Sequence, residues 1–293
     1  MSAKTTVWSG TSGDWSASGN WTNGVPDADD HVYFENNAQS VTTGFPSGTV
    51  NLGSLNIDQS YTGSLASAAT GPLNLGIAEL NIGYHNGPGT PAGAPSIYLN
   101  LGSAIACTIT VSNTGTSADA SRAPVRLYGS NASNTLTVKK GKVEFGTNTG
   151  DTTSALSALT VSYDTRVNTD ADVFIGSGVT LTTTNIFGGD TVYECDCTTT
   201  NVHAGTLLAA GAWVGTTTFT SYGGTSTINS TGTITNCNIY GGTVDFTKTS
   251  GAKVITNMNL AKGGVLKFNS TGTTLSNGIM SLDVGQDTTY TAS

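Results

Sequence analysis

Charge is scarce in this sequence of 293 residues, because Lys, Arg, Asp and Glu make up 10% of it where about 25% is usual for soluble domains. The formal net charge is −8. The basic residues cluster only at Lys139, Lys140 and Lys142, around a glycine that predicts a solvated turn. Phosphate binding needs clustered Lys and Arg, so this composition argues against nucleic acid as a partner.

Long apolar runs and a secretory leader are also missing. No stretch reaches the roughly 18 apolar residues of a membrane span, so the sequence predicts no membrane partner. Residues 1–6 lead into the first motif without an apolar segment or a cleavage site. Two interpretations stay open: a virion protein that folds in the host cytoplasm, or a mature chain whose signal has been removed.

Patterns typical of metal sites are absent as well. Cys195 and Cys197 share one face of an expected strand, but a metal site would need a second such pair and histidines. The three histidines, His31, His85 and His203, lie far apart in the sequence. We therefore expect buried thiols in a reducing compartment and predict no metal and no cofactor.

Helical periodicity is nearly absent, while strand patterns occur throughout the chain. Short segments of alternating apolar and polar residues, bounded by Gly, Asn or Ser, predict strands, for example at 54–57 and 243–246. Ordinary β-sandwiches also have short strands, so the discriminating feature is a repeat. A similar sequence motif recurs around Asn236, Asn257 and Asn277, at intervals of 21 and 20 residues, which indicates stacked coils.

The repeat predicts an all-β fold, a right-handed parallel β-helix over residues 51–293 with about 20 residues per coil and roughly 12 coils. Equal residues of successive coils then lie about 4.8 Å apart. Asn236, Asn257 and Asn277 are therefore expected to form a ladder of hydrogen-bonded amides at a coil corner. Antiparallel hairpins in some coils stay an alternative.

Two further features of the coil follow from this repeat. Pairs of glycines are expected to mark a second corner, at 188–189, 223–224, 241–242 and 263–264. Apolar residues of two successive coils are expected to stack inside, namely Val244 and Phe246 over Val265, Leu266 and Phe268.

The first fifty residues differ from the rest. Trp8, Trp15 and Trp21 fall within fourteen positions, and we expect residues 1–50 to form a Trp-rich cap. Clustered tryptophan is typical either of a hydrophobic plug over the open end of a coil or of a platform on which sugars stack, and we favour the plug. The segment around these three residues is a candidate docking region.

A second candidate docking region is the segment 86–96. It contains Pro88, Pro91 and Pro95 together with three glycines, a composition that excludes regular structure. We interpret it as a loop that projects from one coil. It serves either as a contact arm for a partner or simply as a mobile surface loop.

The N-terminal motifs resemble the opening of a broad group of β-helical proteins, which includes autotransporter-like and adhesin-like bacterial surface proteins and structural proteins of tailed phages. The resemblance covers residues 7–57 and lies in Trp8-Ser-Gly, Gly13-Asp-Trp, Asn20-Trp-Thr-Asn-Gly-Val-Pro, Asp29-Asp-His-Val and Ser54-Leu-Asn-Ile. It implies the fold more than the function. The sequence lacks the signal peptide and membrane anchor of the surface proteins, which shifts the expectation to the phage members.

Carboxylates are the one candidate for catalysis. Two acids about one coil apart on one face suit glycoside hydrolysis, and Asp170/Asp190 and Asp172/Glu194 have that spacing. Asp among Thr, Gly and Asn is more typical of turns, so we predict no enzymatic activity. The remaining acids of interest, Asp27, Asp29 and Asp30, suit either weak Ca²⁺ binding or the capping of backbone amides, and we prefer capping.

The leading prediction is a non-enzymatic phage virion protein that decorates or cements the capsid. By analogy with the phage members, its partners would be the major capsid protein and itself, as a homotrimer. The alternative is a tail protein or surface adhesin that recognises glycan, with polysaccharide cleavage as a variant. The alternative predicts exposed aromatic residues along one side, such as Tyr222, Tyr240 and Trp213.

Overall fold

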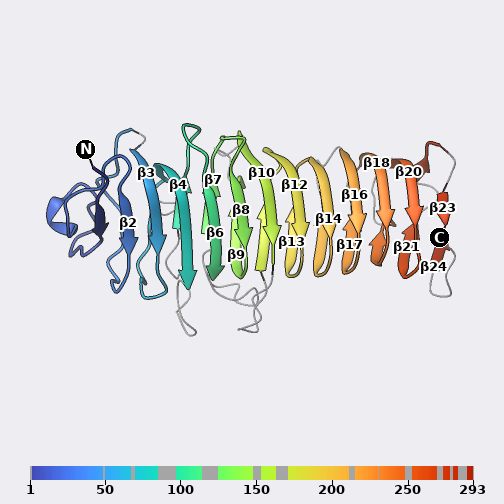
Figure 1. Ribbon diagram of the computed structural model, residues 1–293, viewed down its shortest axis with the longest axis horizontal. Helices are drawn as coiled ribbons and strands as arrows, with labels where there is room; N and C mark the ends of the chain where they lie inside the picture. Colours follow the sequence, from blue (N-terminus) through green and yellow to red (C-terminus); the bar gives the residue numbers. More distant parts are fainter. Residues whose placement is uncertain are drawn as a thin grey trace.

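The computed structural model is a parallel β-solenoid of about 10 turns with about 22 residues per coil (Figure 1). The two termini lie at opposite ends of the rod. Among the residues that the structure describes, helix is confined to one 3₁₀ turn, η1 (Ser18–Asn20), and no helix is long and apolar enough to cross a membrane. The predicted all-β, parallel β-helical class is therefore confirmed.

The structure describes residues 2–48, 50–66, 70–84, 97–113, 125–147, 153–162, 171–210, 215–229, 231–247, 253–268, 273–277, 280–282 and 289–292. Short strands joined by tight corners account for most of these residues. In chain order they are β1 (Thr5–Val7), β2 (His31–Phe34), β3 (Val50–Ile57), β4 (Leu73–Tyr84), β5 (Ile97–Asn100), β6 (Thr108–Asn113), β7 (Val125–Tyr128), β8 (Thr135–Val138), β9 (Gly141–Phe145), β10 (Ser154–Val161), β11 (Ala171–Ile175), β12 (Val179–Ile186), β13 (Asp190–Tyr193), β14 (Cys197–Val202), β15 (Thr206–Ala209), β16 (Gly215–Ser221), β17 (Thr225–Ile228), β18 (Gly232–Ile239), β19 (Gly242–Asp245), β20 (Lys253–Leu260), β21 (Gly264–Phe268), β22 (Thr273–Leu275), β23 (Met280–Leu282) and β24 (Thr289–Ala292).

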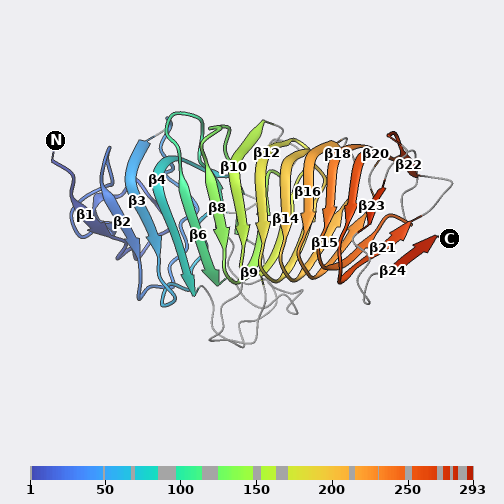
Figure 2. The same ribbon diagram turned by 45° about the vertical axis from the view of Figure 1, so that its right-hand side comes forward.

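Two series of strands run along the rod, and each strand pairs in parallel with its equivalent in the next coil (Figure 2). One series runs from β1 through β2, β3, β4, β6, β8, β10, β12, β14, β16 and β18 to β20. The other runs from β5 through the odd-numbered strands β7 to β21 and ends at β24. The parallel stack therefore already includes β1 and β2 of the Trp-rich segment.

Coil length varies along the rod, which corrects the predicted period. Asn74 and Asn100, on neighbouring rungs, are 26 residues apart, whereas Asn185 and Asn201 are separated by 16. The prediction of about 20 residues and roughly 12 coils was extrapolated from the regular C-terminal repeats. Longer connections between the strands of the N-terminal coils raise the average to about 22 and reduce the number of turns to about 10.

The core is a column of inward-facing side chains produced by strand alternation. In β19 and β21, Val244 pairs with Leu266 and both are buried, as are Phe246 and Phe268. Val265 is the exception to the predicted core stack, because it pairs with Thr243 and is half-buried on the outer side. Adjacent residues of a strand face opposite sides, so Val265 and Leu266 cannot both point inward.

The predicted asparagine ladder is confirmed, but its expected place at a coil corner was wrong, because Asn236 and Asn257 lie within β18 and β20. The Asn257 amide Nδ2 donates to Asn236 Oδ1 at 2.9 Å, and Asn277 Nδ2 donates to Asn257 Oδ1 at 2.6 Å. The side chains lie on the outside of the rod, with Cys237 and Met258 paired beside them in the core. Each amide donates to one neighbour and accepts from the other, so the ladder links coils through side chains as well as backbone.

Glycine corners are confirmed as well. One glycine of each predicted pair has a positive φ. It is the second glycine in the first three pairs, Gly189, Gly224 and Gly242, and the first glycine in the last pair, Gly263. At Gly242 (φ 74°) a Cβ would lie 2.5 Å from backbone atoms of Gly223 and Gly224 in the preceding coil. Only glycine allows both the left-handed backbone and this close approach of successive corners.

Two glycine substitutions separate these two requirements. Gly24 has a similar φ of 79°, but a Cβ there would meet no heavy atom within 4 Å. Gly24→Ala should lower the free energy of unfolding by about 1–2 kcal/mol, the cost of the left-handed backbone. Gly242→Ala should lower it by about 1–3 kcal/mol more, because the coils must also move apart. Urea denaturation of both variants checks this, and equal losses would contradict the close packing of corners.

Candidate functional site

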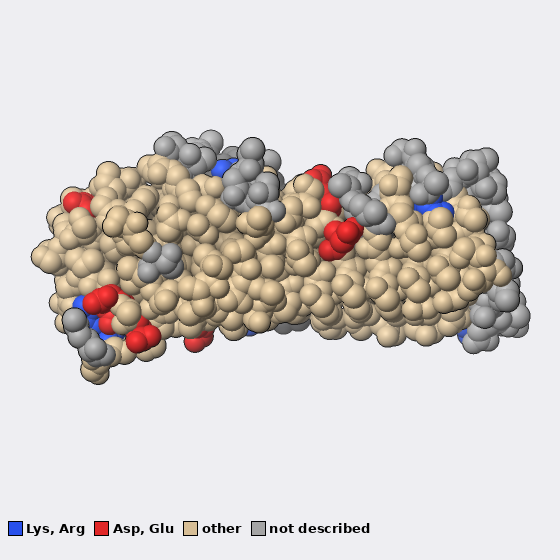
Figure 3. Space-filling view, turned by 90° about the horizontal axis from the view of Figure 1, so that it is seen from above, with Lys and Arg blue, Asp and Glu red and all other residues tan. Residues whose placement is uncertain are grey.

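The sides of the rod are nearly free of charge. Figure 3 shows one face on which the acidic and basic residues form small, separate groups among neutral ones. Some charges pair between neighbouring rungs, with Arg126 Nε 3.2 Å from Glu144 Oε2 and Lys267 Nζ 4.0 Å from Asp245 Oδ2. Such surface pairs contribute only about 0–1 kcal/mol each. The functional surface must therefore be sought among neutral side chains.

The three clustered tryptophans plug the N-terminal end of the core. Trp8, Trp15 and Trp21 are at most 4% exposed. The Trp21 ring meets Trp8 and Trp15 edge to face, with centroids 4.9 and 4.7 Å apart, and all three pack on Phe34. These rings are covered, so they offer no platform to a sugar. A docking role for this segment would rest on its other atoms and stays a prediction.

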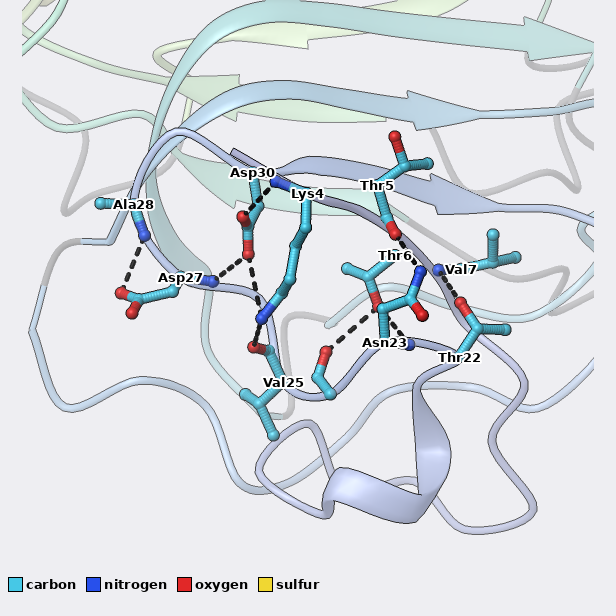
Figure 4. A network of polar contacts seen from close by, with 11 residues as sticks. Lys4, Thr5, Thr6, Val7, Thr22, Asn23, Val25, Asp27, Ala28 and Asp30 are labelled. Atoms are coloured by element: carbon cyan, nitrogen blue, oxygen red, sulfur yellow. Dashed lines mark hydrogen bonds and ion pairs between the residues drawn. The ribbon is translucent and has the colours of Figure 1, made fainter. Parts of the chain in front are cut away.

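A polar network beside the plug uses one of the three clustered aspartates. The buried Asp30 carboxylate accepts hydrogen bonds from the backbone amides of Lys4 at 3.0 Å and Asp27 at 2.7 Å (Figure 4). The ammonium group of Lys4 lies 3.4 Å from it and also donates to the Val25 carbonyl oxygen. Asp27 itself accepts from the Ala28 amide. Asp27 and Asp30 therefore cap backbone amides, as we preferred.

The acidic residues considered for catalysis are arranged differently from the prediction. Asp172 pairs with Asp190 on the next rung, whereas the predicted partner Glu194 bonds through its amide to Ile175. Asp170 lies outside the described residues. Burial raises the pKa of Asp172, as does the nearby charge of Asp190, while Lys142 lowers it. The predicted spacing was wrong because this coil spans 18 residues, fewer than we assumed.

An aromatic row on one corner is the most distinctive surface feature. Phe187, Tyr222 and Tyr240 are 46%, 51% and 43% exposed, and they are the exposed large apolar residues of the described chain. With His203 they form a stack across four successive coils, in the order Phe187, His203, Tyr222, Tyr240. The ring centroids are 4.5, 4.7 and 5.5 Å apart, with interplanar angles of 13°, 10° and 29°. We call these four residues the aromatic ridge.

The ridge exists because four consecutive corners have the same length. One row of paired positions is Ile186, Val202, Ser221 and Ile239, and the next is Asp190, Thr206, Thr225 and Thr243. Three residues lie between the two rows in each coil, at 187–189, 203–205, 222–224 and 240–242, and the ring residue is the first of each three. The register on both sides of each corner is unbroken, so equal positions lie one rung apart. The rings therefore stack without any insertion that would separate them.

Polar side chains border the ridge on both sides. Two residues before each ring, a strand position carries an amide or hydroxyl, at Asn185, Asn201, Thr220 and Asn238. Three residues after each ring, the next strand carries Asp190, Thr206, Thr225 or Thr243 at its first or second position. Neighbouring rungs are linked here too, because Asn201 Nδ2 donates to Asn185 Oδ1 at 3.0 Å and the Thr206 hydroxyl donates to Asp190.

The sequence predicted two of the four residues of this ridge. Tyr222 and Tyr240 were expected on one exposed side, and they are exposed there, while Trp213 lies outside the described residues. Phe187 and His203 were missed. The available signal was their place directly before Gly188-Gly189 and Ala204-Gly205, which aligns them with the two tyrosines once coils are superposed on their glycine corners.

The other predicted sites contribute less. Pro88, Pro91 and Pro95 lie outside the described residues, so a docking role for them stays a prediction. The four cysteines are buried and free, as expected, and burial raises the pKa of Cys107 and Cys237 to about 12. Over the described part of the chain, no group of three or more His, Cys, Asp or Glu residues is placed to hold a metal ion.

Comparison of the chain with protein-family models, with curated proteins and with solved structures finds no match. What the protein does must therefore be inferred from its own residues. Within the described residues, the aromatic ridge is the surface whose composition departs most from the neutral Thr and Asn faces around it.

The network in Figure 4 gives a test of the cap. Amide hydrogen bonds and the charge of Lys4 outweigh burial and lower the pKa of Asp30, so its carboxylate stabilises the fold above the unfolded-state pKa near 3.8. Asp30→Asn should reduce the free energy of unfolding at pH 7 by about 1–3 kcal/mol. The difference from wild type should shrink as the pH falls below 4, because the wild-type carboxylate becomes protonated. A difference that stays constant in urea titrations at pH 7 and pH 3 would contradict this role.

Proposed function

We propose that this chain is a non-enzymatic structural protein of a phage virion, which decorates the capsid and cements neighbouring capsomers. The observation that carries the proposal is the preformed rod, in which successive coils are joined by parallel backbone pairing and one end is closed by buried tryptophans. A rigid rod loses little conformational entropy when it docks. The resemblance of residues 7–57 to structural proteins of tailed phages supports the same assignment.

The proposed partners are the major capsid protein and further copies of the chain, as a homotrimer. The side of the rod adjoining the ridge offers an uncharged face for such packing, formed by two columns of paired outward positions. One column is Thr108, Thr135, Ala158, Thr183, Thr199, Thr218, Asn236 and Asn257, and the other is Thr110, Thr137, Thr160, Asn185, Asn201, Thr220, Asn238 and Asn259. A neutral face avoids the cost of desolvating charges when two rods associate.

A second candidate function is glycan recognition by a tail protein or surface adhesin. The exposed, stacked positions of Tyr222 and Tyr240 favour it, because exposed aromatic rings in a row are an exceptional feature on a surface otherwise made of Thr, Asn and Gly. Glycan recognition leaves the first column free for packing, because the ridge is bordered by residues of the second column such as Asn201 and Asn238.

The copy number of the protein in purified particles from its source tests the primary proposal. Quantitative mass spectrometry should find the chain at a copy number comparable with that of the most abundant particle protein, as a lattice decoration requires. A few copies per particle would move it to the tail and leave glycan recognition as the main function. Absence from the particles would overturn the virion assignment.

A further inference from the structure

We infer that the aromatic ridge is a binding site for a neutral polysaccharide, which stacks a sugar ring on the open face of Tyr240. The inference deepens the second candidate function by naming the ligand class and the position at which it binds. It holds whether the rod is mounted on a capsid or a tail.

Exposure of the rings is the first argument. A stack that served only to stabilise the corners could bury its rings, as the tryptophan plug does. Instead, Phe187, Tyr222 and Tyr240 each leave about half of their surface in water. Tyr222, which has a ring neighbour on both faces, is the most exposed of the three at 51%, so the solvent sees mainly ring edges and the phenol end. Contiguous exposed apolar surface of this kind marks interaction sites.

The C-terminal end of the ridge provides the open ring face. After Tyr240 the next position in the row is Ala261, whose amide bonds to the Ile239 carbonyl oxygen as the ring residues of the earlier corners do with their own neighbours. The stack therefore ends with one aromatic face that has no ring partner in the row, and such a face is where the CH groups of a pyranose can pack.

The corner next to this face differs in length from the ridge corners. Leu260 pairs with Ile239, and Val265 pairs with Thr243. Four residues lie between the paired positions here, at 261–264, where three lie between them in the ridge corners. At Gly242 a Cβ would lie 2.5 Å from the preceding corner, but at Gly263 the nearest atom would be the Tyr240 carbonyl oxygen at 3.8 Å. Gly264, the register partner of Gly242, keeps the close approach, because a Cβ there would lie 2.8 Å from Ile239. The added length of this corner therefore lies at Gly263 and the exposed Lys262.

The border of the ridge identifies a sugar rather than a protein as the ligand. Asn201, Asn238, Thr225 and Thr243 flank the rings with amide and hydroxyl groups, which both donate and accept and so match the hydroxyl groups of a saccharide. A protein hot spot would instead be ringed by contacts that exclude water from its aromatic anchors.

The charge distribution indicates that the saccharide is neutral. The polar columns along the two central rings contain no acidic or basic side chain, and charge is found at the ends of the ridge, at Asp190 and Lys262. A polyanionic chain would need basic residues along its length. Successive rungs about 4.8 Å apart suit a linear polymer that runs along the rod and contacts several of them.

Affinity electrophoresis of the full chain tests this, in gels that contain laminarin, mannan, dextran or soluble starch, with alginate as an anionic probe. At least one neutral polymer should retard the wild type. Tyr240→Ala should weaken binding about tenfold, because the stacking face is lost. Ala261→Leu keeps every ring but places an aliphatic side chain over that face, and it should weaken binding to a similar extent. Thr235→Ala, a change at an exposed position of β18 away from the ridge, serves as the matched control and should leave binding unchanged.

Melting temperatures of the same variants separate binding from folding. Ala261→Leu should melt within a few degrees of the wild type while binding falls. No retardation by any neutral polymer, retardation by alginate alone, or unchanged binding of both ridge variants would each overturn the inference. The copy number of Tyr240→Ala in particles should equal that of wild type. Loss of that variant from particles, with polymer binding intact, would show the ridge to be a docking surface for a protein.

Discussion

Parallel backbone hydrogen bonding between successive coils is the constraint on which the rest of this structure depends. It fixes equivalent residues about one strand spacing apart, so whatever the sequence repeats becomes a continuous column. Three asparagines become a hydrogen-bonded ladder, and four corner residues become a stack of rings. Because each coil contacts only its neighbours, both features depend on local regularity and not on a central core.

The same constraint creates a problem at the ends of the rod, where a coil has no neighbour to cover its apolar interior and its unpaired backbone. The N-terminal segment solves it with two features. Three tryptophans close the core, and a buried carboxylate satisfies backbone amides beside them. The concentration of Trp within the first fifty residues is thus explained by stability. Because these tryptophans are buried, only the exposed rings of the aromatic ridge are available to bind a ligand among the aromatic residues discussed above.

The two proposed roles use different consequences of one architecture. A rod that is already ordered, with neutral sides, suits permanent attachment to a lattice, because little entropy is lost and few charges must be desolvated. The ridge adds a local site whose spacing is set by the same rungs. A decoration protein that also holds polysaccharide would place many weak sugar contacts on one particle, and multivalency would convert them into strong attachment.

Local sequence determined the strand alternation, the glycine corners and the asparagine ladder, since each depends on residues within one or two coils. Long-range register was decided only in the folded chain, because it depends on the length of every connection. The regular repeats at Asn236, Asn257 and Asn277 misled the coil count, and a shorter coil brought Asp172 next to Asp190 rather than to Glu194. Phe187 and His203 joined the tyrosines for the same reason. Four corners of equal length align these residues, and the equal length is visible only when the corners are compared with one another.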